Sequence, residues 1–332
     1  MRALMKNLQT LFHIAQAYFT AKKFPISVTF IATYRCNFSC RYCGIYNFDG
    51  YEMNTSEVIS MIDEFSRMGM RRFSFNGGEP LLRPDIQELT AYCKKKGLFT
   101  TLFTNGWQVR QKLDAVRNLD ILIVTLDGPP ETHDLQRNKP ESCVYALEAI
   151  RAARRQNIVT WTNTVITRGN AGNLDFILQK AKEMGFWAIF QPVLEYAHSS
   201  GQSQIERLKP DTKDYQAAVR LLISRKKEGA HIAHSYKYLK YILNPDWGQN
   251  KRRCWAARLY CAVKPNGEVA PCYPVFNQQQ CPNGLDAGFA AAFQKSELNG
   301  CGGCYCIIAE SDFFYSLYPG AVINTLSRLP GL

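Results

Sequence analysis

Apolar and polar positions between residues 26 and 196 alternate between two spacings. Short runs rich in β-branched and aromatic residues are each followed by a longer stretch whose apolar residues return every three or four positions. The short runs predict strands at Ile26–Tyr34, Arg72–Asn76, Phe99–Thr104, Ile121–Leu126, Val159–Ile166 and Ala188–Val193. The longer stretches predict helices at Ser56–Met68, Pro84–Lys95, Trp107–Val116, Ser142–Gln156 and Asn173–Met184. Strands that alternate with helices in this way predict a parallel sheet.

Residues 1–24 lie outside this alternation and predict an amphipathic helix. One face of this helix gathers the apolar residues, and basic residues flank it: Leu4, Leu8, Leu11, Phe12, Ala15 and Phe19, with Arg2, Lys6, Lys22 and Lys23. The helix either packs across the main domain or lies on a membrane surface, which requires an apolar face with a basic rim. We expect no signal peptide, because polar residues interrupt its apolar part, and no membrane-spanning helix, because no sufficiently long apolar run occurs.

The composition narrows the class of protein further. The chain has 332 residues and a net charge of +12 at pH 7. Its basic residues fall in short separate runs without aromatic residues between them, as at Lys94–Lys96 and Lys251–Arg253. A nucleic-acid platform combines clustered positive charge with stacking aromatic rings, so we expect no nucleic-acid partner. The 12 cysteines, without a convincing export signal, predict reduced thiols that bind metal in the cytoplasm.

Three closely spaced cysteines are the strongest chemical signal. Cys36, Cys40 and Cys43 follow the first predicted strand in a CX3CX2C motif. Thiolates are the ligands of iron–sulfur clusters, and three of them can hold three irons of a cubane and leave the fourth open. Half of a zinc site is the alternative, although structural zinc requires four ligands. The next predicted strand ends in the motif GGEP at residues 77–80.

These two motifs, in this order and at the ends of successive strands, resemble those of the radical S-adenosylmethionine (SAM) superfamily. The resemblance implies a [4Fe–4S] cluster on Cys36, Cys40 and Cys43, with SAM on the open iron. Reductive cleavage of SAM then gives a 5′-deoxyadenosyl radical that abstracts hydrogen from a substrate. The implied fold is α/β, an open partial (β/α)6 barrel of parallel strands over residues 25–235. Six units are too few for a closed eight-fold barrel.

The resemblance also implies contacts to SAM. Tyr42, the aromatic residue before the last cysteine of the motif, corresponds to the residue that contacts adenine in the family. Gly77, Gly78 and Glu79 correspond to the motif that receives the methionyl amine. Glycines let the backbone approach a ligand closely, and a carboxylate complements an ammonium group.

Further candidates for SAM contacts follow the third and fourth predicted strands. By resemblance, Thr125 and Arg137 are expected to hold the SAM carboxylate through a hydroxyl and a guanidinium. Family members usually have serine where Thr125 stands, and the hydroxyl is kept. Asn105 and Asp127 are also candidates, but each precedes a glycine, and Asn-Gly and Asp-Gly equally predict turns.

A second group of cysteines lies between residues 254 and 306. Gly267, in a turn-forming Asn-Gly pair, predicts a β-hairpin between Leu259–Val263 and Val269–Tyr273. Cysteines at the edges of this hairpin, followed by a CX2C motif at residues 301–304, predict a pocket for one metal centre. The arrangement resembles the twitch subdomain of radical SAM enzymes, a shortened SPASM extension, which we assign to residues 236–332.

The resemblance to a twitch subdomain implies an auxiliary [4Fe–4S] cluster with four thiolate ligands: Cys254, Cys272, Cys301 and Cys304. Cys261 is an alternative to Cys254, and Cys306 is an alternative to Cys304. A zinc ribbon with four cysteine ligands also stays open. A cluster with four thiolates has no open iron, so it favours electron transfer over anchoring of a substrate.

The predicted function is that of a radical SAM oxidoreductase acting on a small molecule or lipid, with the auxiliary cluster accepting an electron. About 25 residues precede the first strand, too few for the leader-binding module of many peptide-modifying relatives. The alternatives are modification of a peptide, and transfer of an adenosyl or alkyl group to a lipid or isoprenoid. A non-catalytic metal scaffold is a third hypothesis, and the expected electron donor is a flavodoxin or ferredoxin.

The sequence leaves the substrate and the proton acceptor open. The acceptor candidates are His133, His198, His231, His234, Asp127 and Glu195. A single histidine is more often structural than catalytic, so none of them is chosen.

Overall fold

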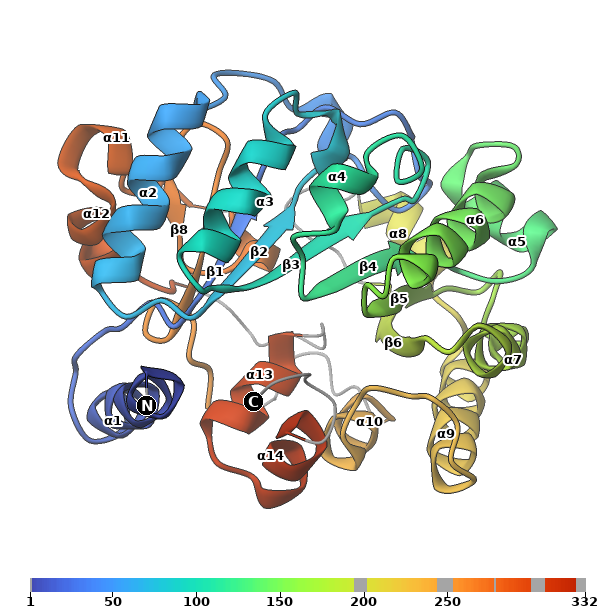
Figure 1. The fold of residues 1–332 in the computed structure, drawn as a ribbon. Helices are drawn as coiled ribbons and strands as arrows, with labels where there is room; N and C mark the ends of the chain where they lie inside the picture. Colours follow the sequence, from blue (N-terminus) through green and yellow to red (C-terminus); the bar gives the residue numbers. More distant parts are fainter. Residues whose placement is uncertain (1, 194–201, 244–252, 278, 300–307, 327–332) are drawn as a thin grey trace.

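The computed structural model describes residues 2–193, 202–243, 253–277, 279–299 and 308–326. Its centre is one curved sheet with the strand order β6-β5-β4-β3-β2-β1-β7-β8 (Figure 1). The strands are β1 Ser27–Ile31, β2 Arg72–Asn76, β3 Phe99–Thr104, β4 Ile121–Thr125, β5 Thr160–Ile166, β6 Trp187–Pro192, β7 Tyr260–Val263 and β8 Val269–Ala270. The predicted α/β fold, a partial (β/α)6 barrel with a C-terminal hairpin, is confirmed.

The helices alternate with the strands over the first six units and follow in groups after β6. The early helices are α1 Arg2–Phe19, α2 Thr55–Arg67, α3 Ile86–Lys95, α4 Leu113–Val116, α5 Pro130–Arg137, α6 Ser142–Arg155 and α7 Leu174–Met184. The later ones are α8 Gln202–Leu208, α9 Thr212–Lys227, α10 Tyr236–Leu243, α11 Gly284–Ala287, α12 Phe289–Lys295, α13 Ile308–Tyr315 and α14 Pro319–Leu326. Short 3-10 turns are η1 Ile45–Asn47, η2 Pro80–Leu82 and η3 Tyr273–Val275.

The first six strands are parallel, and the hairpin extends the same sheet. Ser27 of β1 pairs with Arg72 of β2 on one side and with Tyr260 of β7 on the other. β7 is parallel to β1, and β8 returns antiparallel to β7 with Val263 opposite Val269. The C-terminal hairpin therefore lies directly beside the strand that precedes the CX3CX2C motif.

Side chains alternate between the two faces of each strand, and the two faces have different surroundings. Val28, Phe30, Phe73 and Phe75 are fully buried in the main hydrophobic core beneath the outer helices. Thr29 and Ser74, between them in the sequence, face the inside of the barrel and line a cavity there. The period of two thus assigns apolar residues to the core and polar ones to the inner wall.

Helix ends show why the predicted boundaries are close to the observed ones. The Asn54 side chain accepts a hydrogen bond from the Glu57 N–H, and the Glu57 carboxylate accepts one from the Asn54 N–H, which starts α2 with a capping box. Gly185 ends α7 in the left-handed conformation. The predicted helix at residues 107–116 is wrong in its first part, where turns precede the short α4, and α5 was not predicted.

The helix α1 forms, and in its second half, where side chains are described, the residues that pack are not those of the predicted apolar face. Ile14 and Ala17 are buried against the C-terminal segment around Trp255. Phe12 and Phe19, on the predicted apolar face, are 59% and 83% exposed. Apolar residues occur on more than one side of this helix, so the spacing alone does not determine which side packs. Membrane contact through residues 1–24 stays a prediction.

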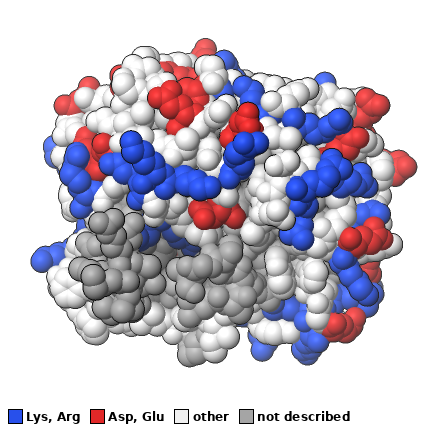
Figure 2. Space-filling view, in the orientation of Figure 1, with Lys and Arg blue, Asp and Glu red and all other residues white. Residues whose placement is uncertain are grey.

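The distribution of surface charge and the length of the apolar helices are the features that bear on binding to nucleic acid or to a membrane. Figure 2 shows Lys and Arg side chains on one face of the molecule with Asp, Glu and uncharged side chains between them. Among the helices that the structure describes, none is long and apolar enough to cross a bilayer.

Candidate active site

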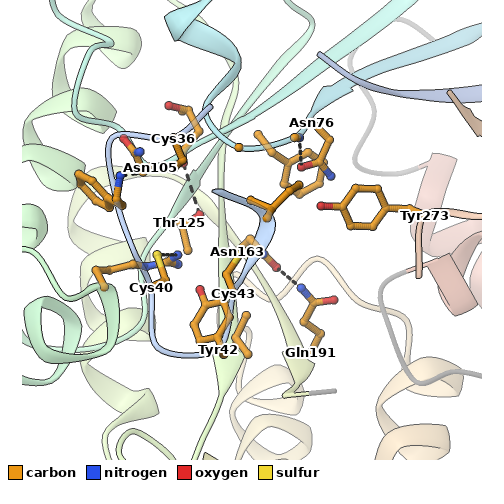
Figure 3. A pocket seen from close by; sticks show the side chains of 18 of the residues that line it. Cys36, Cys40, Tyr42, Cys43, Asn76, Asn105, Thr125, Asn163, Gln191 and Tyr273 are labelled. Atoms are coloured by element: carbon orange, nitrogen blue, oxygen red, sulfur yellow. Dashed lines mark hydrogen bonds between the residues drawn. The ribbon is translucent and has the colours of Figure 1, made fainter. Parts of the chain in front are cut away.

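The inner face of the barrel opens at the carboxyl ends of the strands into a cavity that contains the CX3CX2C loop (Figure 3). Strands β1 to β6 each contribute to its wall or rim, and the C-terminal hairpin segment closes one side. The residues of this wall that carry polar or sulfur atoms include Thr29, Cys36, Cys40, Tyr42, Cys43, Ser74, Asn76, Thr104, Asn105, Thr125, Arg137, Asn163, Gln191 and Tyr273. Parallel barrels place their chemistry at this end of the sheet.

The three predicted cluster ligands meet in this cavity. Cys36, Cys40 and Cys43 all line it, and no three His, Cys, Asp or Glu side chains of the described residues are spaced for a single metal ion. In a cubane cluster each thiolate binds a different iron, and binding of a cluster by these three cysteines stays a prediction. Burial raises the pKa of the Cys36 and Cys43 thiols to about 12. Iron must therefore displace protons from these thiols when a cluster is loaded.

The glycines of the GGEP motif allow two backbone segments to touch. A Cβ on Gly78 would lie 2.2 Å from the Arg35 carbonyl oxygen, and one on Gly77 would lie 2.5 Å from the Thr33 carbonyl oxygen. Gly78 N–H donates to the Thr33 oxygen at 2.8 Å, and Glu79 N–H donates to the Arg35 oxygen at 2.9 Å. The end of β2 is thus fastened to the start of the cysteine loop. Both glycines also line the cavity, where their assignment as SAM contacts stays a prediction.

The Glu79 side chain lies beneath the cavity wall. It is fully buried, and its carboxylate accepts hydrogen bonds from Leu81 N–H at 3.1 Å, Thr104 Oγ1 at 2.9 Å and Asn105 N–H at 2.8 Å. Burial raises the pKa of this carboxyl to about 7, against the lowering effect of the three hydrogen bonds. In the structure the carboxylate supports the loop after β3, and direct contact with a methionyl amine stays a prediction.

Asn105 connects this support to the cysteine loop. Its Nδ2 donates to Asn37 Oδ1 at 2.8 Å, and its Oδ1 accepts from Trp107 N–H at 3.0 Å. Asn105 therefore both forms the turn expected from Asn-Gly and lines the cavity. Thr125 also faces the cavity and donates to the Thr104 carbonyl oxygen at 3.4 Å.

The carboxyl end of α5 holds the other side of the cysteine loop. Residues 136–138 contact residues 39–41: Arg41 N–H donates to the Gln136 carbonyl oxygen at 3.0 Å, Arg137 Nη1 donates to Cys40 Sγ at 3.5 Å, and Asn138 Nδ2 donates to Ser39 Oγ at 3.0 Å. Sequence reasoning missed this helix. The Pro129-Pro130 pair, with proline favoured at a helix start, was the available signal.

Asp127 and Arg137 form a buried ion pair, with Arg137 Nη2 2.8 Å from Asp127 Oδ2. Asp127 is fully buried and accepts from Val165 N–H at 3.0 Å, whereas Arg137 reaches the cavity. Burial raises the pKa of the Asp127 carboxyl, and the guanidinium partly offsets this effect. Tyr42 also lines the cavity, and its hydroxyl donates to Asp127 Oδ2 at 3.5 Å. The structure thus places Asp127 behind the cavity wall and Arg137 in the wall itself, and contact of either residue with SAM stays a prediction.

Uncharged polar side chains from β5, β6 and the segment after β8 also line the cavity, together with apolar ones such as Val165 and Pro192. Gln191 Nε2 donates to Asn163 Oδ1 at 3.4 Å, and the Tyr273 hydroxyl points into the same space (Figure 3). Sequence reasoning missed all three residues, because none of them belongs to a recognised motif. The signal that was available is the period of two, which places Asn163 and Gln191 on the cavity side of β5 and β6.

The described candidates for the proton acceptor lie away from this wall. His133 Nδ1 accepts a hydrogen bond from the Asp127 N–H at 3.0 Å, and burial lowers the pKa of His133 well below its ordinary value. His234 Nε2 accepts from the Phe190 N–H at 2.7 Å, and His231 contacts the Phe186 carbonyl oxygen. His198 and Glu195 lie outside the described residues.

The second cysteine group is described in part. Cys272 is buried in an apolar cluster with Trp255, Leu259 and Tyr260, and Cys254 packs against the same cluster. Cys261 lies in the main core instead, so it is not placed with Cys272. Cys301, Cys304 and Cys306 lie outside the described residues.

Comparisons with known proteins agree with this geometry. The pattern described as Radical SAM superfamily matches residues 30–172, from β1 to the loop before α7. The fold resembles that of native anSMEcpe with bound AdoMet (SAM), with a TM-score of 0.66, 18% identity, and coverage of 92% of this chain and 100% of that one.

The relatives among known sequences include two enzymes named for different activities. The AdoMet-dependent heme synthase of Nitratidesulfovibrio vulgaris (Hildenborough) is 26% identical over 293 residues, which cover 80% of this chain and 77% of that protein. The PqqA peptide cyclase of Xanthomonas campestris pv. campestris is 27% identical over 265 residues, which cover 75% of this chain and 67% of that protein.

The barrel, the cysteine loop and these matches define an enzyme that uses SAM and a [4Fe–4S] cluster. The chain belongs to the radical SAM superfamily, and its homologues are SPASM-domain enzymes.

Proposed function

We propose that this protein is a radical SAM enzyme that modifies a peptide, with an auxiliary [4Fe–4S] cluster in its C-terminal part. The relationship to a PqqA peptide cyclase supports a peptide substrate, and the relationship to a heme synthase supports a tetrapyrrole. The first relationship favours the peptide alternative over the small-molecule or lipid substrate expected from the sequence, whereas a tetrapyrrole would belong to the small-molecule class. The structure of the cavity bears on the choice between these two.

The observation that carries the proposal is the charge of the cavity wall. Among the described residues that line it, Arg137 is the one with a positively charged side chain, and it forms an ion pair with Asp127. Tetrapyrroles on the way to heme carry several carboxylates, which need cationic partners when buried. The amides of Asn163 and Gln191 and the phenol of Tyr273 instead offer uncharged donors and acceptors. Such groups match the backbone and neutral side chains of a peptide.

The chain's own residues would divide the work in the cavity. When bound, the reduced cluster and SAM supply the radical that abstracts hydrogen from the substrate. Cys36, Cys40 and Cys43 would hold the cluster, and Tyr42, Thr125 and Arg137, which line the same cavity, would position SAM. Asn163, Gln191 and Tyr273 would orient the peptide in the cavity, because proximity and orientation decide which hydrogen is taken.

The proposal of an auxiliary cluster rests on the positions of two cysteines. Cys254 and Cys272 share one apolar cluster, and Tyr273, next to Cys272, faces the SAM cavity. The adjacent residues Tyr273 and Cys272 thus connect the cavity to the expected metal centre. We propose Cys254, Cys272, Cys301 and Cys304 as its ligands, with Cys306 as the alternative to Cys304. An electron leaving the substrate radical would have a short path to this centre.

The test is an anaerobic assay with reconstituted protein, SAM and dithionite. One arm contains peptides encoded beside the gene, and the other contains heme-precursor tetrapyrroles. We expect a mass change in a peptide that depends on SAM, with 5′-deoxyadenosine formed alongside. Modification of the tetrapyrrole with no change in any peptide would overturn the proposed substrate class while leaving the enzyme class intact. A flavodoxin or ferredoxin stays the predicted physiological donor.

A further inference from the structure

The buried guanidinium of Arg137 contacts a sulfur that holds the first cluster. Arg137 is 5% exposed, and its Nη1 donates to Cys40 Sγ at 3.5 Å. A second guanidinium nitrogen, Nη2, lies 2.8 Å from Asp127 Oδ2, and the guanidinium carbon lies 5.3 Å from the centre of the Tyr42 ring. These contacts involve three different groups, and only one of them is a carboxylate.

The surrounding structure fixes this guanidinium in place. Asp127 accepts a hydrogen bond from the Val165 N–H at 3.0 Å, so the carboxylate cannot follow a moving arginine. The neighbouring contacts of Gln136 and Asn138 with the cysteine loop hold the end of α5 against that loop. The positive charge of Arg137 therefore stays next to Cys40, and the negative charge of Asp127 stays next to Arg137.

Hydrogen bonds to ligand sulfurs and nearby charges tune the reduction potential of iron–sulfur clusters. Reduction adds one electron to the cluster, and part of the added negative charge resides on its sulfurs. A buried cation at hydrogen-bond distance stabilises that charge, because little water is present to screen it. A carboxylate beside the cation has the opposite effect.

We propose that Arg137 raises the reduction potential of the SAM-binding cluster through its contact with Cys40, and that Asp127 limits this rise. This role is separate from holding the SAM carboxylate, since the contact to sulfur exists in the chain itself. It makes the cluster easier to reduce by the donor. The role also does not depend on the identity of the substrate.

The test is a redox titration of the reconstituted protein, monitored by the electron paramagnetic resonance signal of the reduced first cluster. It is made without SAM and then with SAM, in protein whose auxiliary cysteines are replaced (Cys254→Ala/Cys272→Ala), so that one cluster is observed. We expect Arg137→Gln to lower the midpoint potential and Asp127→Asn to raise it. Arg137→Lys keeps the charge without the two-sided contact and should lie between Arg137→Gln and the parent protein.

A matched variant separates charge from loop packing. Ser39→Ala removes the hydrogen bond from Asn138 to the same loop without changing any charge, and we expect an unchanged potential. Iron content and circular dichroism establish that each variant is folded and loaded. If Arg137→Gln and Asp127→Asn shift the potential in the same direction, or if neither shifts it, the proposal is wrong. A shift that occurs only with SAM present would also overturn it, because Arg137 would then act through the SAM carboxylate.

Discussion

The Glu79 carboxylate accepts a hydrogen bond from the Asn105 N–H at 2.8 Å, in the fully buried layer beneath the cavity wall. Asn105 in turn donates to Asn37 of the cysteine loop. Two motifs that are far apart in the sequence are thereby joined to the segment that would hold the cluster. Glu79 acts on the site through its neighbours in this structure.

Glu79 should make the stability of the cluster-free protein depend on pH. Its folded pKa of about 7 lies above the ordinary value of 4.5, so the folded state binds more protons between these values. The contribution to stability is fully present below pH 4.5 and is lost as the pH rises through 7. The loss is about 3 kcal/mol, at roughly 1.4 kcal/mol per pKa unit. Denaturant unfolding at pH 4.5 and pH 8 measures it.

Comparison with variants isolates this effect from other titrating groups. Glu79→Gln should lose less stability over the same pH interval than the wild-type protein, although it is less stable overall because an amide cannot accept all three hydrogen bonds. Exposed Glu88 on α3 provides the control, and Glu88→Gln should keep the wild-type slope. Equal slopes for Glu79→Gln and the wild type would contradict the assignment.

Gly78→Ala should disrupt the cysteine loop. The added Cβ would lie 2.2 Å from the Arg35 carbonyl oxygen, a backbone atom that cannot rotate away. Overpacking of this kind costs about 1–3 kcal/mol or more, and here the strain falls on the residues just before Cys36. We expect a lower unfolding temperature and less iron per chain after reconstitution. Gly172→Ala, where nothing lies within 4 Å, should leave both unchanged.

Replacing Cys36, Cys40 and Cys43 together with alanine should abolish formation of 5′-deoxyadenosine. The three side chains lie in a loop at the cavity, so the hydrophobic core should survive. Iron content should fall by about four per chain, the number in one cubane. Cys93→Ala is the control, because Cys93 is buried in the core on α3 and does not line the cavity. Continued SAM cleavage by the triple variant under dithionite would place the cluster elsewhere.

The two buried cysteines of the hairpin should behave differently. Cys272 shares an apolar cluster with Cys254, whereas Cys261 lies in the main core. Cys272→Ala should therefore lose about four irons per chain, and Cys261→Ala should keep them. In Cys272→Ala we expect 5′-deoxyadenosine still to form without a matching amount of product. Stoichiometric zinc in anaerobically purified protein would show a zinc ribbon instead.

Tyr273→Phe should separate SAM cleavage from product formation. Tyr273 lines the cavity but is not among the predicted SAM contacts, so loss of its hydroxyl should leave SAM affinity within about twofold of the wild type, a difference of only ~0.4 kcal/mol. The ratio of modified peptide to 5′-deoxyadenosine should fall, because one group that orients the substrate is missing. Liquid chromatography with mass spectrometry measures both. Tyr236→Phe on α10, outside the cavity wall, should keep the wild-type ratio.

The sequence determined the elements that depend on near neighbours along the chain. Strand periodicity placed β2 and β3 at their observed bounds, and the spacing of Cys36, Cys40 and Cys43 indicated a cluster site and the family. The Asn-Gly turn at Gly267 predicted the hairpin. Such signals are readable because alternation, capping and motif spacing act over a few residues.

Tertiary structure decided which of these residues face the cavity. Tyr42 and Asp127 are 85 positions apart, and Arg137 and Cys40 are 97 apart, so no local pattern predicts their contacts. The pairing of β7 with β1 brought Tyr273 to the cavity and sent Cys261 into the core. The Glu79 carboxylate lies buried below the cavity wall, because the groups that donate hydrogen bonds to it lie there, at the ends of neighbouring strands and turns. These outcomes depend on how the strands are ordered in the sheet, which periodicity alone does not encode.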